Sequence, residues 1–297
     1  MDAWTAFRRL LAFDWGRLPL EELAQWLGMT VAELRSVEVR YHSFEVPKRA
    51  GGARTIHAPD APLRAVQDAI NYRVLRGVRA HQAAHGFEVG RSIVTNARPH
   101  VGQAAVVTID LRDFFPATKA ARVRRFFRAI GWSRIAATQL AHLTTHEGGL
   151  PQGAPTSPRL SNLVNFRMDV RLAKLAEKLG ARYTRYADDL TFSFAEDDRD
   201  RIWAAMTMAG RIVGEFGYEV NARKGGVRRR HQRQEVTGLV VNQGIALPRQ
   251  TRRWLRAVEH RLRTRGSCSL AEDELQGWLA YVSMVHRQGK GAGIPDV

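Results

Sequence analysis

The feature that most constrains the fold is a pair of adjacent aspartates, Asp188 and Asp189, in the segment RYADDLTFS at residues 185–193. Over residues 181–194 the side chains alternate around this pair with the period of two that is typical of strands. The apolar members of the second half fall on one face: Leu190, Phe192 and Phe194. The pattern predicts strand, turn and strand, with both carboxylates at the tip. Because adjacent like charges repel, the pair does not serve stability, and a bound cation would explain it.

A third carboxylate, Asp110, ends the apolar segment AAVVTID (104–110), which is typical of a buried central strand. A charge at the end of such a strand is costly unless it is paired or bound to a cation. Acids from two different strands make a hard-oxygen site with few ligands, which suits Mg²⁺. Two such ions could activate an attacking hydroxyl and stabilise a departing pyrophosphate. We expect Asp110 and Asp188 to bridge the ions, with Asp189 contributing less directly; an exposed Asp-rich turn is the alternative.

The charge balance indicates a polyanionic partner. The 297 residues include 46 Lys and Arg against 29 Asp and Glu, a net charge of +17, which favours nucleic acid. An anionic membrane surface would usually require one basic amphipathic helix rather than arginines spread along the chain. No apolar run approaches the ~20 residues that span a bilayer, and the N-terminus does not read as a signal peptide. A single cysteine, Cys268, excludes an internal disulfide and fits a reducing compartment. We therefore expect a cytoplasmic protein that does not bind membranes.

Helical patterns precede and follow the strands. Residues 18–37 predict two short helices, because Gly28 can end the first and Thr30 with Glu33 forms a capping box for the second. This pair either packs at the edge of a domain or reads DNA as a helix-turn-helix. Further predicted elements are a basic hairpin within 46–59 and helices over 63–77, 121–130 and 158–179.

A basic helix is predicted over residues 249–265. One face carries Arg249, Arg253, Arg256, His260 and Arg263, and another carries Leu255, Val258 and Leu262. Such a helix suits a nucleic-acid groove, although a merely solvated charged face would look the same.

Three ordered segments resemble the palm motifs of reverse transcriptases: IDLRDFFPAT (109–118), GGLPQGAPTSPRLSNL (148–163) and RYADDLTFS. Residues 96–100 (NARPH) are similar to the Asn-Ala-x-x-His signature of retron reverse transcriptases, and residues 236–238 to their Val-Thr-Gly signature. Two further segments, PKRAGGARTIHAP (47–59) and HGFEVGRSIVTNA (85–97), resemble the fingers segments of that family. The resemblance extends from about residue 20 to 285.

This resemblance implies an α+β fold, the right-hand polymerase with fingers, a palm built on an antiparallel sheet, and an α-helical thumb. The corresponding parts are an N-terminal helical segment (1–40), fingers (41–104), palm with interleaved fingers elements (105–244) and thumb (245–297).

The resemblance also implies roles for single residues. Asp110, Asp188 and Asp189 would bind the catalytic metals. Phe115 would pack beneath the incoming sugar and exclude a ribose 2′-OH, unless it is ordinary core. Gln152 would lie along the nucleotide and template, and Gly153 would let the backbone come close.

Cations of the fingers would hold the triphosphate, and the candidates are Lys48, Arg54 and Arg91, with Arg54 ranked first. Lys224 would protonate the leaving pyrophosphate or act as a plain electrostatic partner.

Further residues are implied in RNA binding: Asn96, His100, Arg249, Arg253, Arg256 and Arg263. For His100 a structural role is equally open. The thumb, including Trp278 and Tyr281, would grip a cognate RNA stem-loop.

The function implied is RNA-directed DNA synthesis that uses dNTPs and a dedicated noncoding RNA as template and primer. Synthesis would start from a guanosine 2′-OH and give multicopy single-stranded DNA in phage defence, with an effector protein and a separate host ribonuclease H. The alternatives are a group II intron-like or other defence-associated reverse transcriptase, and a non-catalytic nucleic-acid-binding regulator.

Overall fold

The computed structural model describes residues 17–47, 51–265 and 270–289. The chain divides into two compact units. The first comprises residues 1–82, 111–170 and 213–219, and the second comprises residues 83–110, 171–212 and 220–297. Lys48 and Cys268 lie outside the described residues. No helix in the described part of the chain is both long and apolar enough to span a bilayer.

The first unit begins with the two predicted short helices, α2 (Leu20–Leu27) and α3 (Val31–Ser36). Gly28 ends α2 in the left-handed region, with φ 74°, and the capping box of α3 forms as expected. The Glu33 carboxylate accepts from the backbone N–H of Thr30 at 2.7 Å, and the Thr30 hydroxyl accepts from that of Glu33 at 3.2 Å. The apolar faces of both helices join the core of this unit, which favours the packing role over DNA reading.

The rest of the first unit is a hairpin and a set of helices. The hairpin joins β1 (Tyr41–Pro47) to β2 (Ala53–Pro59). Its helices are α4 (Ala61–Ala69) with the π-helix η1 (Ile70–Leu75), α6 (Phe114–Ala117), α7 (Ala120–Ala129), α8 (Arg134–Thr144) and α9 (Ser157–Val164). The predicted helix over 63–77 is therefore helical to residue 75, and its apolar face is buried as expected.

The single helix predicted over residues 158–179 is wrong, because the chain forms α9 and then α10 (Phe166–Lys178) with a break at Asn165. Asn165 is fully buried. Its amide donates to the Ser161 carbonyl at 2.9 Å and to the Tyr218 hydroxyl at 2.7 Å, and it accepts from the Arg122 guanidinium at 2.6 Å. A buried amide with this many partners outweighs the continuity of one helix.

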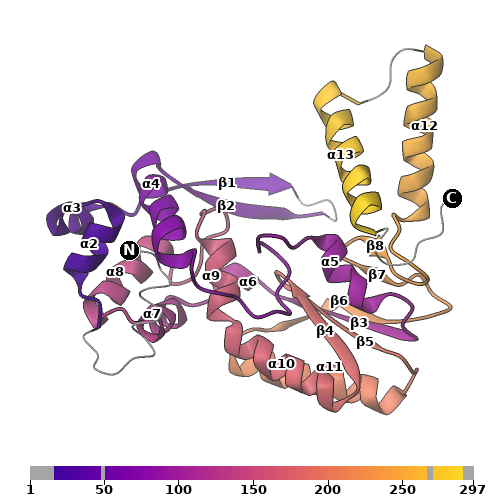
Figure 1. Cartoon of the computed structure of the whole chain (residues 1–297), viewed down its shortest axis with the longest axis horizontal. Coiled ribbons are helices and arrows are strands. Elements are labelled where there is room, and N and C mark those ends of the chain that lie inside the picture. The colour runs from indigo at the N-terminus through magenta and orange to yellow at the C-terminus, as the bar shows by residue number, and fades with distance from the viewer. Residues whose placement is uncertain (1–16, 48–50, 266–269, 290–297) are drawn as a thin grey trace. The chain divides into compact units, whose positions relative to one another are not determined.

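The second unit is built on a four-stranded sheet with the order β4-β5-β3-β6 (Figure 1). The strands are β3 (Ala105–Leu111), β4 (Ala181–Tyr186), β5 (Asp189–Phe194) and β6 (Val220–Arg229), and helix α11 (Arg199–Glu215) connects β5 to β6. β3 and β4 both pair antiparallel with β5. The predicted antiparallel sheet is confirmed. Both faces of β5 are buried, the one with Thr191 and Ser193 as well as the apolar one.

A second core lies in the same unit and joins the two short signature segments. α5 (Ile93–Ala97) and η2 (Arg98–His100) carry the first, and β7 (Glu235–Val236) with β8 (Leu239–Val240) flanks the second. Val94, Val236 and Val285 pack in this core, and the Thr237 hydroxyl donates to the Ile93 carbonyl at 3.2 Å.

Two long helices, α12 (Arg249–Arg265) and α13 (Glu272–Gly289), end the described chain. On α12 Val258 is buried and Leu255 is half-buried, as predicted, but Leu262 is 39% exposed. The predicted apolar stripe therefore fails at its last position. Trp254 of α12 meets Trp278 of α13 edge-on, with ring centroids 5.0 Å apart.

We expect Asn165→Ala to lower the free energy of unfolding by about 1–3 kcal/mol, because it leaves buried polar partners unsatisfied. Chemical denaturation measures this. Since Tyr218 shares the hydrogen bond, the loss should be less than additive with that of Tyr218→Phe. Strictly additive losses would contradict this account of the break between α9 and α10.

Candidate active site

The three predicted carboxylates meet at one end of the sheet in the second unit. Asp110 of β3 lies directly opposite Asp189 of β5 in the antiparallel register, and Asp188 lies in the turn just before β5. Residues directly opposite each other in such a pair have their side chains on the same face. The register therefore sets Asp110 opposite Asp189, and the expectation that Asp110 and Asp188 bridge the metal ions stays a prediction. Asp189 begins a strand rather than occupying the tip.

The electrostatics show that negative charge is crowded at this point. Burial, followed by the charges of Asp188 and Asp110, raises the pKa of Asp189 to about 6, although its side chain still reaches solvent. Asp110 is 7% exposed. Its two oxygens face donors from β6: the Asn221 amide donates to one at 2.9 Å, and Lys224 Nζ lies 3.4 Å from the other. One lysine offsets part of the charge of three carboxylates.

The turn that carries Asp188 is supported by a buried hydrogen bond and by close backbone packing. Ala187 adopts the left-handed region, with φ 54°, which is uncommon for a residue with a Cβ. The buried Arg185 guanidinium donates to the Ala187 carbonyl at 3.1 Å. Gly86 lies so close that a Cβ there would come within 2.9 Å of the Ala187 nitrogen. A strained turn with such support presents its carboxylates in a fixed place.

β6 contributes residues that sequence reasoning missed. Asn221 was not predicted as a site residue, because only the pairing of β6 with β3 brings it to Asp110. Gly225 adopts φ 89° and packs against β3, where a Cβ would come within 2.4 Å of the Thr108 carbonyl oxygen. This close approach explains a glycine in the strand.

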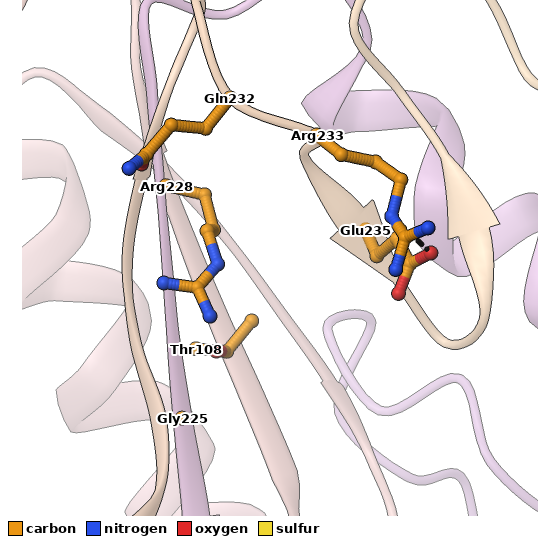
Figure 2. Close-up of a pocket in the computed structure, with 6 residues that line it drawn as sticks. All are labelled: Thr108, Gly225, Arg228, Gln232, Arg233 and Glu235. Atoms are coloured by element: carbon orange, nitrogen blue, oxygen red, sulfur yellow. Dashed lines mark ion pairs between the residues drawn. The ribbon is translucent and has the colours of Figure 1, made fainter. Parts of the chain in front are cut away.

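A pocket of about 470 Å³ lies between β3 and the segment from β6 to β7, where its lining comes from Thr108 and from residues between 225 and 235 (Figure 2). Thr108 lines it and precedes Asp110 by two residues, so both side chains lie on one face. Arg228 extends toward Thr108, while Arg233 pairs with Glu235 at 2.9 Å (Figure 2). Within the described part of the chain Arg228 has no ion-pair partner, so its charge is available to an anion.

The residues predicted to bind the nucleotide belong mostly to the first unit. Arg54 is exposed on β2, and Phe115 is half-buried against the core, edge-on to Phe114 at 5.5 Å. The ordinary-core alternative therefore explains at least part of the Phe115 ring. Arg91 belongs to the second unit and lies just before α5, while Lys48 lies outside the described residues.

The fold itself requires glycine at position 153, which the sequence did not reveal. Its φ is 125°, and a Cβ would come 2.7 Å from Ile56 Cγ2 and 2.8 Å from the His57 carbonyl oxygen. The backbone N–H of His57 donates to the Gln152 carbonyl at 2.8 Å. The close approach that requires glycine is thus made by β2 of the same unit.

Asn96 and His100 are fully buried, which favours the structural role of His100 over direct RNA contact by either side chain. His100 Nδ1 lies 2.6 Å from Ser193 Oγ, and its Nε2 lies 2.8 Å from Thr184 Oγ1. The imidazole therefore ties η2 to β4 and β5, the two strands on either side of the turn that carries Asp188. Neither polar atom of the Asn96 amide has a hydrogen-bond partner in the described residues.

The predicted RNA-binding arginines of α12 are exposed, as that role requires: Arg249, Arg253, Arg256 and Arg263. Among the described residues no group of three or more His, Cys, Asp or Glu side chains is arranged to hold a metal ion by itself. Mg²⁺ is usually bound through one or two carboxylates together with water and substrate phosphates, and Asp110 and Asp189, opposite each other on β3 and β5, could supply those carboxylates.

Residues 46–241 match the family model described as reverse transcriptase (RNA-dependent DNA polymerase). The chain is 40% identical to the retron Mx65 reverse transcriptase of Myxococcus xanthus and 31% identical to the retron Ec86 reverse transcriptase of Escherichia coli, over 90% of this chain in each case. It spans 68% and 84% of those relatives, and 63% of the retron Mx162 reverse transcriptase of Myxococcus xanthus, to which it is 36% identical.

Solved structures with a similar fold include a telomerase from Candida albicans in complex with a fragment of telomeric RNA. The TM-score is 0.52 at 12% identity, covering 92% of this chain and 60% of the telomerase chain. An apo telomerase from Candida tropicalis gives a TM-score of 0.51 at 13% identity, over 74% of this chain and 61% of that one. These likenesses confirm the predicted fold class.

The burial of His100 predicts an acid-sensitive fold. Burial, then the positive charges of His85 and Arg182, lowers the pKa of His100 to about 3, and burial with Arg91 lowers the pKa of His85 to about 4. Below pH 6.5 the unfolded chain therefore binds protons that the folded chain does not, and each such group costs about 1.4 kcal/mol of stability per pH unit. We expect the contribution of these two histidines to be constant above pH 6.5 and to become increasingly destabilising as the pH falls toward 4, while Asp189, whose pKa is raised, offsets part of this loss below pH 6.

Thermal unfolding between pH 7.5 and pH 5 tests this. His100→Gln should be less stable at pH 7.5 but lose less on acidification than the wild type. His260→Gln, at an exposed site on α12, is the control. Equal slopes for His100→Gln and the wild type would contradict the account.

Proposed function

Because this chain belongs to the reverse transcriptase family, in its retron type, whose members are RNA-directed DNA polymerases, we propose that it copies a cognate structured noncoding RNA into multicopy single-stranded DNA. The observation that carries the proposal is the convergence of Asp110, Asp188 and Asp189 beside Lys224 at one end of an antiparallel sheet. Carboxylates crowded in this way favour a divalent cation, because a cation relieves their mutual repulsion.

The three acids would hold two Mg²⁺ ions, which when bound activate an attacking hydroxyl and stabilise the charge of a departing pyrophosphate. Lys224 has the position and exposure to give a proton to an oxygen of that pyrophosphate, since its ammonium lies beside Asp110 but remains open to solvent. Asn221 orients the Asp110 carboxylate through its hydrogen bond.

The remaining residues bind and position substrate. Arg54, Arg91 and Lys48 hold the triphosphate of the incoming dNTP, and Gln152 lies along the nucleotide and template. The exposed part of the Phe115 ring packs beneath the sugar and disfavours a ribose 2′-OH. Arg228, in the pocket beside Thr108 (Figure 2), offers a guanidinium to a phosphate of the nucleic-acid backbone.

The RNA serves as template and primer, with synthesis starting from a guanosine 2′-OH. The predicted thumb, from residue 245 onward, grips a stem-loop of that RNA through the arginine face of α12. The biological role is phage defence with an effector protein, and a host ribonuclease H removes the copied template. The relatives, which are named retron reverse transcriptases, support the retron type, and this part of the proposal follows from the resemblance to that family.

A group II intron-like enzyme is the competing proposal, since it shares the same carboxylates. It would extend arbitrary primed templates without a cognate RNA. Sequencing the nucleic acid that copurifies with the chain separates the two, because the retron type should carry one recurrent RNA joined to its DNA copy.

We expect Asp110→Asn and Asp188→Asn each to reduce primer extension at least about a hundredfold. Losing a metal-binding carboxylate removes several kcal/mol of charge stabilisation, and each 1.4 kcal/mol is about tenfold in rate. Asp197→Asn is the matched control. Asp197 pairs with Arg229 at 2.8 Å and follows the end of β5 that is opposite to Asp189. Equal product from wild type and Asp188→Asn would reject the assignment.

Charge reversal on α12 tests RNA recognition by the thumb. Arg253→Glu with Arg256→Glu should weaken binding of the copurifying RNA about tenfold or more, because both guanidiniums face phosphates, and should change extension of a short generic primer much less. Arg211→Glu with Arg261→Glu makes the same change in charge off the predicted face. Equal losses in the two assays would count against a role in specificity.

A further inference from the structure

The first unit contains a cavity of about 840 Å³, and none of its lining residues belongs to the proposed polymerase site. Its walls come from α7, the start of α10, the turn after η1 and the end of α11, and every residue lining it belongs to that unit. Ligand sites commonly measure about 300–1,000 Å³, so the cavity has room for a nucleotide.

The floor of the cavity is apolar and partly aromatic. Phe126 and Phe166 line it together with Ile130 and Leu163. Phe166 is 42% exposed, and its ring meets His81 edge-on at 5.5 Å. An exposed ring in a hollow offers a face for stacking, and every nucleobase has a π-face to match it.

Positive charge surrounds this floor. The lining includes Arg122, Arg125 and Arg167, and Glu215 opposes them. Arg122 donates to the Phe216 carbonyl at 2.7 Å and to the Asn165 amide oxygen at 2.6 Å, and both of these acceptors are neutral. Arg125 and Arg167 are exposed and form no ion pair with another described residue. The local charge therefore favours an anionic ligand.

We propose that this cavity binds an unpaired nucleotide of an RNA loop, with the base stacked on Phe166 and a flanking phosphate held by Arg125 and Arg167. The combination of an aromatic surface and guanidiniums matches single-stranded RNA, whose splayed bases stack on aromatic rings while its phosphates pair with arginine. The net charge of +17 favours the same partner over an apolar protein segment. The inference rests on the proposed function only in taking RNA as the partner, and it adds a site remote in sequence from α12.

The test measures binding of two fluorescent RNAs to the full chain after bound nucleic acid has been removed. One is a hairpin with an unpaired loop, and the other is a blunt duplex with the same stem sequence. Phe166→Ala, and separately Arg125→Ala with Arg167→Ala, should weaken hairpin binding about tenfold and duplex binding less than about threefold, since stacking and its phosphate contact serve only the unpaired base.

Matched variants control for the loss of charge and for the loss of an exposed aromatic ring. Arg124→Ala with Arg128→Ala removes the same charge from exposed positions of α7 outside the cavity, and Trp203→Ala removes an exposed aromatic ring elsewhere. Both should affect hairpin and duplex alike. Phe166→Trp keeps a stacking surface and should retain hairpin binding, which a purely structural role of the ring would not predict.

Hairpin binding that survives in the cavity variants would overturn the proposal and leave the cavity to another occupant, such as a protein segment. Equal losses for hairpin and duplex would also overturn it, because they indicate general charge rather than a base site. Primer extension on a short primed template, run with the same preparations, keeps the two proposals apart. An inactive wild type counts against the polymerase assignment, whereas an active wild type with unchanged hairpin binding in the variants counts against this cavity alone.

Discussion

The pairing of β3 with β5 is the constraint on which the rest depends, because it sets Asp110 opposite Asp189 and leaves Asp188 in the adjoining turn. Carboxylates so placed destabilise one another, and their repulsion adds to burial in raising the pKa of Asp189. A chain keeps such an arrangement only if the surrounding structure holds it. Here the buried Arg185 and the close packing of Gly86 support the turn, and Lys224 offsets part of the charge.

Local patterns predicted local structure well. The end of α2 at Gly28, the capping box of Thr30 and the strands on either side of the aspartates all follow from neighbouring residues, so the sequence suffices for them. The break at Asn165 does not, because its partners come from distant segments. β6 also went unpredicted, since Val220–Arg229 is rich in Arg and Gly and becomes a strand only by pairing with β3.

For the site, the family resemblance identified residue types, and the structure changed the reasons for several. Gly153 is needed by the approach of β2, and His100 and Asn96 are buried rather than presented to RNA. A sequence motif records that a residue is required but not whether a ligand or the fold requires it. Asn221 shows the converse, because no motif marks it and only the register of the sheet brings it to Asp110.

The central claim is that Asp110, Asp188 and Asp189, at one end of the sheet, hold divalent cations once the substrate supplies the remaining ligands. Binding of Mn²⁺, a paramagnetic substitute for Mg²⁺, can be followed by electron paramagnetic resonance on the chain with a primed template and a non-hydrolysable dNTP. The account predicts that Asp110→Asn weakens Mn²⁺ binding in this complex about tenfold or more, through loss of a hard-oxygen ligand. Binding of equal strength in the wild type and in Asp110→Asn would contradict it.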